Sequence, residues 1–280
     1  MDPALFTFVL LLSAAGAGLL GSLTGLGGGV VLVPLLVLVF GVDLKYAVGA
    51  SLIVVIATSS GAAAAFMREG FTNLRVAMLL QVATVLGAIA GAAIAGVLPR
   101  AGVAIIFALV AMYSAWGAIR TPPPPVDLSL PPDPLSRRLG LESTYPGPAG
   151  PIAYRACRVP LGFGIMILAG MLSAVVGIGG GVLKVLAMDR AMRLPYKVST
   201  TTSNFMIGVT AAASAGIYFQ RGQIEPALCA PVALGALAGA LAGARVLPRI
   251  HVRTLRFIFA GIVTLAGVEM LRRALTGGFA

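Results

Sequence analysis

Long runs without charge constrain this chain more than any other feature of its sequence. Residues 3–42 contain no charged side chain, and as a single helix they would extend about 60 Å, roughly twice the hydrocarbon core of a bilayer. We therefore expect two passes here, or one pass followed by a re-entrant segment. The later apolar runs cover residues 46–67, 76–99, 101–119, 159–188, 198–220, 226–244 and 257–271.

The composition excludes a soluble fold. Charged residues make up 10% of the 280 residues, whereas soluble domains carry about 25%. So few charges cannot cover a water-exposed surface. A transmembrane β-barrel is disfavoured as well, because its strands alternate apolar and polar residues and these runs are apolar all round. The sequence predicts an all-α polytopic membrane protein.

The sequence also contains an internal duplication, with an offset of 152 residues. GLGGGV at residues 25–30 aligns with GIGGGV at residues 177–182, and 14 of the 54 positions from 17 to 70 are identical to their counterparts. Apolar composition alone does not align glycine triplets and lysines. We predict a first membrane repeat at residues 1–120 and a second at residues 159–280, joined by a linker at residues 121–158.

The linker differs from both repeats in composition. It holds ten of the 18 prolines, four of them consecutive at residues 122–125. Proline at this density favours extended or disordered backbone. We expect a solvent-exposed connector.

The basic residues distinguish parallel from inverted repeats. If the short piece after each glycine triplet re-enters, the halves are parallel and, with Lys184 left aside, the lysines and arginines divide 10 against 9 between the two faces. If it crosses, each half has five passes, the halves are inverted, and the division is 14 against 5, or 9 against 5 without the linker arginines and the adjoining Arg120. The positive-inside rule therefore favours two inverted repeats, with both termini in the periplasm and the linker in the cytoplasm.

Glycine triplets inside apolar runs need a physical reason. Each glycine weakens a helix by about 1 kcal/mol relative to alanine, and the freed backbone N–H groups need partners within the membrane. A triplet can begin a helix whose N-terminal N–H groups point inward, and two such broken helices at the repeat interface indicate a midplane site that prefers anions. Close helix packing is the alternative. The candidate ligand-binding glycines are Gly27, Gly28, Gly29, Gly179, Gly180 and Gly181.

Polar side chains accompany these breaks. Six consecutive polar residues occupy positions 199–204, more than helix capping needs, so we expect part of the run to bind ligand. Lys184, three residues after the second triplet, either neutralises an anion or snorkels to the interface near Asp189, and we favour snorkelling. The candidate polar ligands are Ser51, Lys184, Thr202, Ser203 and Asn204.

The sequence lacks the residues that several classes of function require. One tryptophan and unclustered aromatics give no base-stacking platform for nucleic acid. The two cysteines, Cys157 and Cys229, form no CxxC or Cys/His cluster, so disulfide and metal sites are excluded. Eight of the nine acidic residues lie in or beside predicted loops, which leaves no buried carboxylates to relay protons. We expect no enzymatic activity, no cofactor and no nucleic-acid partner.

These motifs resemble those of the sulfite exporter TauE/SafE family. The resemblance rests on the two GxGGG segments, Pro34, the sequence AVGASL at residues 47–52 and TSNF at residues 202–205. It implies a permease of the bacterial inner membrane that moves sulfur-containing anions such as sulfite or organosulfonates. The chain departs from the family pattern at two positions, because Leu186 is the counterpart of Pro34 and Ala50 replaces the first-half threonine.

We therefore expect a secondary transporter for small anions that works by alternating access at a midmembrane site. A passive anion channel and a non-transporting membrane scaffold remain as alternatives. The expected partners are a small anionic substrate and the lipid bilayer. The sequence leaves both a monomer and a homodimer open.

Overall fold

A computed structural model describes residues 3–24, 28–68, 70–119, 133–147, 150–246 and 252–278. In chain order its elements are α1 (Pro3–Thr24), α2 (Gly29–Pro34), the π-helix η1 (Leu35–Val39), α3 (Leu44–Arg68), α4 (Leu74–Val97), α5 (Arg100–Ile119), α6 (Pro134–Arg138), β1 (Ser143–Gly147), β2 (Gly150–Tyr154), α7 (Val159–Val176), α8 (Gly181–Leu186), the π-helix η2 (Ala187–Ala191), α9 (Tyr196–Gln220), α10 (Pro226–Val246) and α11 (Val252–Leu275).

The prediction of an all-α polytopic membrane protein is confirmed. Within the described ranges, six helices are long and apolar enough to cross a membrane: α1, α3, α4, α5, α7 and α10. Two further helices have comparable length but contain more polar residues. The first is α9, 25 residues long, which includes the polar run at 199–204, and the second is α11, 24 residues long.

The duplication is visible in the secondary structure. The elements α2, η1 and α3 recur as α8, η2 and α9 at the same offset of 152 residues. The hydrogen bonds that end the π-helices recur as well: Phe40 N donates to Leu35 O, as Met192 N donates to Ala187 O. Six α-helical and five π-helical residues extend only about 16 Å, roughly half a hydrocarbon core.

Small residues allow the long helices to pack closely. The α4 helix packs on α7, and α10 packs in the corresponding way on α1, while α3 packs on α9. A Cβ atom added at Gly87 or Gly91 would overlap the α7 backbone, and one at Gly235 or Gly239 would overlap the α1 backbone. These four glycines therefore serve helix packing.

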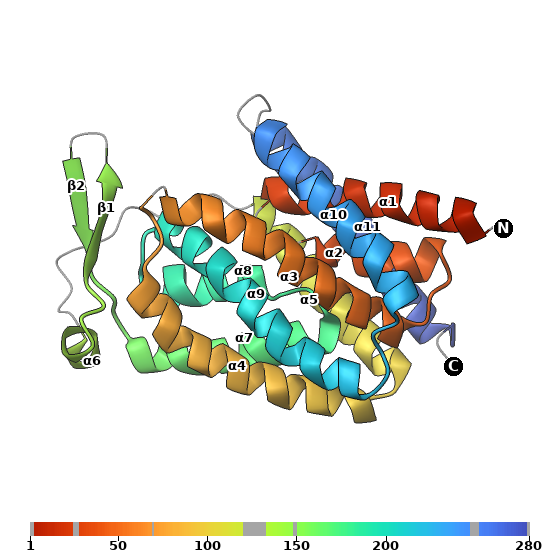
Figure 1. Cartoon of the computed structure of the whole chain (residues 1–280). Coiled ribbons are helices and arrows are strands. Elements are labelled where there is room, and N and C mark those ends of the chain that lie inside the picture. The colour runs from red at the N-terminus through yellow and green to blue at the C-terminus, as the bar shows by residue number, and fades with distance from the viewer. Residues whose placement is uncertain are drawn as a thin grey trace.

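The two ends of the helical body differ. Both chain termini lie at one end, while α6 and the β1–β2 hairpin project from the opposite end (Figure 1). The hairpin is antiparallel, with Ser143 opposite Tyr154 and Gly147 opposite Gly150.

Part of the expected linker is extended, in β1 and β2, but residues 133–147 and 150–158 are not solvent-exposed throughout. Leu141 and Tyr154 are buried in a cluster with α4, α7 and α9 side chains. Asn73, at the start of α4, donates from Nδ2 to the Leu141 carbonyl oxygen (3.2 Å) and the Tyr154 hydroxyl (2.8 Å). Burial raises the pKa of the Tyr154 phenol above its usual value. Proline density did not reveal these anchors, and residues 121–132 lie outside the described ranges.

Candidate functional site

The two helix interruptions at the glycine triplets lie close together, near the place where α3 packs against α9. A Cβ atom at Gly29 would lie 2.6 Å from the Gly177 carbonyl oxygen. The Ser51 hydroxyl on α3 lies 2.8 Å from that same oxygen and 2.7 Å from Val48 O. The first-half helix α3 is thus joined directly to the second-half break.

The second break requires glycine because of its backbone conformation. Gly177, Gly179 and Gly180 have φ values of +70°, +78° and +66°, a region that L side chains rarely adopt. A Cβ atom at Gly180 would also lie 2.9 Å from the Ser173 Cβ. Gly181 then begins α8 and is buried.

The described part of the first break does not share this requirement. Gly28 has a helical φ of −66°, and a Cβ atom there would make ordinary contacts at 3.5 Å. Gly29 begins α2, whereas Gly27 lies outside the described residues. The two predicted glycine sites are therefore related by sequence but differ in conformation.

Lys184 on α8 lies inside the protein. Its side chain is 0% exposed, and Nζ donates to Thr210 Oγ1 on α9 at 2.7 Å. The snorkelling interpretation is therefore wrong: the amine turns towards the helix interface. Its burial leaves an ionisable group sealed between α8, α9 and α4.

Two side chains of α4 complete a cluster around Thr210. Gln81 Nε2 donates to Thr210 Oγ1 (3.2 Å), and Thr84 Oγ1 lies 3.3 Å from the same oxygen. Thr84 Oγ1 also donates to Gln81 O, at 3.1 Å. We call Lys184, Gln81, Thr84 and Thr210 the lysine cluster.

The lysine cluster has unused polar capacity. No carboxylate of the described residues lies within 4.0 Å of Lys184 Nζ. Gln81 Nε2 carries a second hydrogen for which no acceptor is found among the described residues, while Gln81 Oε1, an acceptor, is buried there without a hydrogen-bond partner. An unpaired buried amine beside hydroxyl and amide groups has the chemistry of an anion site rather than a cation site.

The predicted polar run is divided between several tasks. Ser203 Oγ donates to Gly181 O (3.2 Å) and so holds the start of α8. Thr202 Oγ1 accepts from Asn73 N (3.1 Å), near the hairpin, while Asn204 is buried on α9. The structure thus brings Ser203 and Ser51 to the second break and places Thr202 at the base of α4.

Sequence reasoning missed Thr84 and Thr210 as members of the site. Thr210 aligns with Thr58 in the duplication, which marks it as a repeat position, and Thr84 lies one turn after Gln81 on the same face of α4. Those spacings were the available signals. Neither of them reveals that α4 packs against α9 beside Lys184.

The comparison with protein families agrees with the sequence motifs. The model of the family described as "Sulfite exporter TauE/SafE" matches residues 10–270 of this chain. The chain belongs to the TauE/SafE family.

Two relatives from Bacillus subtilis (strain 168) are similar over nearly their full length. "Probable membrane transporter protein YunE" is 24% identical over 263 residues, which cover 91% of this chain and 93% of the relative. "Probable membrane transporter protein YjnA" is 27% identical over 256 residues, covering 91% and 95%. No solved structure matches this chain. With its apolar helices, this TauE/SafE protein is a multi-pass membrane transporter.

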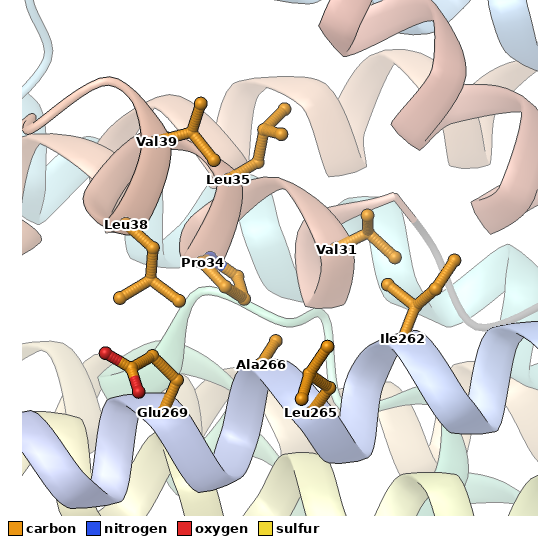
Figure 2. A pocket seen from close by; sticks show the side chains of 9 residues that line it. All are labelled: Val31, Pro34, Leu35, Leu38, Val39, Ile262, Leu265, Ala266 and Glu269. Atoms are coloured by element: carbon orange, nitrogen blue, oxygen red, sulfur yellow. The ribbon is translucent and has the colours of Figure 1, made fainter.

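A separate cavity of the TauE/SafE protein lies between its first short helix and α11. It has a volume of about 450 Å³. Figure 2 shows Val31, Pro34 and Leu38 pointing from α2 and η1 towards α11. Glu269 lies at one end, but its carboxylate is paired with Arg272 and Arg273. The lining is otherwise apolar, so this cavity lacks the donors of an anion site.

Proposed function

We propose that this transporter carries small anions through the lysine cluster. The observation that carries the proposal is Lys184, fully buried, bonded to Thr210 and without a carboxylate partner among the described residues. Charge-assisted hydrogen bonds contribute about 1.5–3 kcal/mol, roughly twice the contribution of neutral ones. A bound anion would supply the negative counter-charge that Lys184 lacks, and it would accept from the second Nε2 hydrogen of Gln81.

We infer that the substrates are sulfur-containing anions such as sulfite or organosulfonates. The family description names sulfite export, whereas the two relatives are named only as membrane transporters. Small oxyanions suit a site that offers an amine, an amide and hydroxyls. The chain would move its substrate without chemical conversion.

Alternating access between two inverted repeats is the mechanism that we propose. The offset of 152 residues in the short helices and the reciprocal packing of α4 on α7 and α10 on α1 support two equivalent repeats, and the position of both termini at the end opposite the hairpin supports their inversion (Figure 1). Following the positive-inside rule, we propose that the linker at residues 121–158 faces the cytoplasm and the termini face the periplasm of a bacterial inner membrane. The lysine cluster is sealed in this conformation, as an occluded state requires.

Flux measurements in proteoliposomes test this function. We would compare uptake of sulfite, sulfate, thiosulfate, taurine and sulfoacetate, with and without unlabelled substrate inside. A carrier saturates and shows counterflow. Flux that rises linearly with concentration and lacks counterflow would indicate a channel, and an absence of flux for every anion would support a scaffold.

A further inference from the structure

We propose that each anion bound at the lysine cluster is accompanied by one proton, taken up by the Lys184 amine, so that anion and proton cross the membrane together. This inference rests on the proposed function and adds the coupling ion. It differs from a carboxylate relay, because the proton carrier is a base that becomes cationic when the substrate is present.

The surroundings of Lys184 favour a neutral amine when no anion is bound. An isolated charge in a membrane protein is costly unless it is paired and hydrogen-bonded. Thr210 Oγ1 accepts one hydrogen from Nζ, and within the described residues the other hydrogens of an ammonium group have no acceptor. The empty cluster therefore suits a neutral amine, which carries fewer hydrogens and no charge.

The groups facing α8 do not offer a substitute counter-ion. The elements packed against it are α5, α7, α9 and η2, and α4 approaches through Gln81. α7 contains no charged residue. The charged and titratable residues of the other elements are Arg75 on α4, Arg100 and Tyr113 on α5, Tyr196, Lys197 and Tyr218 on α9, and Asp189 and Arg190 on η2.

Each of these groups that has a contact in the structure is directed elsewhere. Within the described residues, Asp189 Oδ1 is buried without a hydrogen-bond partner, 3.8 Å from Arg190 Nε, and forms no ion pair with Lys184, while Arg100 forms an ion pair with Asp43 at 2.9 Å. Lys197 lies over the Phe71 ring at 5.1 Å, and the Tyr218 hydroxyl donates to Ala174 O. The negative charge that balances a protonated Lys184 must therefore arrive with the ligand.

The transport step balances in atoms and charge. As an anion enters, the Lys184 nitrogen lone pair takes a proton from a hydronium ion on the open side, so that one O–H bond breaks as one N–H bond forms, and the ammonium pairs with the anion. When the anion leaves on the other side, that N–H bond breaks and the proton returns to water there. A monovalent anion thus moves without net charge, whereas a divalent anion moves with one net negative charge.

Calorimetry of the purified full-length protein tests this coupling. Methanesulfonate and thiosulfate are suitable probes, because neither changes its protonation between pH 6 and 8. The binding enthalpy is measured in two buffers of different ionisation enthalpy, which reports the protons taken up per anion. We expect about one proton for the wild type. Binding without buffer dependence would overturn the inference and leave the proposed function intact, whereas no binding of any sulfur anion would contradict the proposed function itself.

Variants identify the group that takes up the proton. Lys184→Arg keeps a permanent charge, so it should bind the anion with no proton uptake. Asp189→Asn is the matched control on the adjoining η2 and should retain an uptake of about one proton. Proton uptake that persists in Lys184→Arg would contradict the assignment to Lys184. If Lys184→Arg does not fold, loss of uptake in Asp189→Asn would contradict it equally.

Discussion

Lys184 Nζ and Thr210 Oγ1 lie 2.7 Å apart in the protein interior, on two helices of the second half. Their first-half counterparts in the duplication are Leu32 and Thr58. Thr58 Oγ1 donates to Val54 O of its own helix, so no comparable cross-helix pair forms there. The fold is duplicated, but within the described residues a buried lysine bonded to a threonine of the neighbouring helix occurs in the second repeat alone, and the first repeat contributes Gln81 and Thr84 to the lysine cluster.

The conformation of Gly180 predicts a difference between the two breaks. Gly180→Ala forces a side chain into the left-handed region, at about 1–2 kcal/mol, and brings its Cβ against Ser173. Gly28→Ala is the matched control, because Gly28 has a helical φ and open contacts. Thermal unfolding of the purified variants should show a lower Tm for Gly180→Ala and a nearly unchanged one for Gly28→Ala. Equal values would contradict this reading of the breaks.

Gly91 predicts how tightly α4 and α7 pack. The Cβ of Gly91→Ala would overlap the Met171 backbone, so the two helices must separate, and we expect a marked loss of folded protein. Gly164→Ala on α7 is the control, since a Cβ there has no neighbour within 4 Å and alanine favours the helix. Size-exclusion profiles in detergent provide the measurement. A monodisperse Gly91→Ala protein of normal stability would show that the packing is looser.

Much of this fold follows from the sequence, for identifiable reasons. A long uncharged run that is apolar on all sides satisfies its backbone hydrogen bonds in lipid by forming an α-helix, so the lengths of these runs locate the helices. The glycine triplets locate the points where the helices are interrupted. The environment of Lys184 could not be derived in this way. Gln81 and Thr84 lie about a hundred residues earlier, and only the packing of α4 against α9 brings them to it.

For the linker, the sequence predicted less buried structure than the protein has. Proline density indicated an extended or disordered connector exposed to solvent; β1 and β2 are extended, yet Leu141 and Tyr154 are buried against the helices. Asn73 provides the anchor from outside the linker, and a composition argument confined to residues 121–158 does not include it.

Asn73 therefore predicts how the hairpin is held. Its Oδ1 accepts from Val76 N at the start of α4, while Nδ2 donates to Leu141 and Tyr154. Asn73→Asp keeps the helix cap and loses both Nδ2 donors. We expect faster proteolysis within residues 133–158, with helix content and Tm little changed. Arg75→Ala, which removes one contact to Gly140 O at the surface, should have a smaller effect. Unchanged proteolysis in Asn73→Asp would show that the buried side chains alone hold the hairpin.

The orientation in the membrane gives another prediction. In a background with Cys157 and Cys229 replaced, single cysteines are introduced near Arg137 and near Gly278. A membrane-impermeant reagent added to intact cells should label the position near Gly278 and miss the one near Arg137. Labelling near Arg137 from outside would overturn the proposed orientation.

The most direct test of the lysine cluster is anion affinity in Lys184→Met. Loss of the charge-assisted interaction should weaken binding more than tenfold, since about 1.4 kcal/mol corresponds to one decade. Ser203→Ala removes a hydroxyl that is occupied by Gly181 O, so its affinity should fall less than tenfold. Isothermal titration of the wild type and both variants, with the sulfur anion that shows the strongest flux, measures this difference. A Lys184→Met affinity equal to that of the wild type would contradict the central claim.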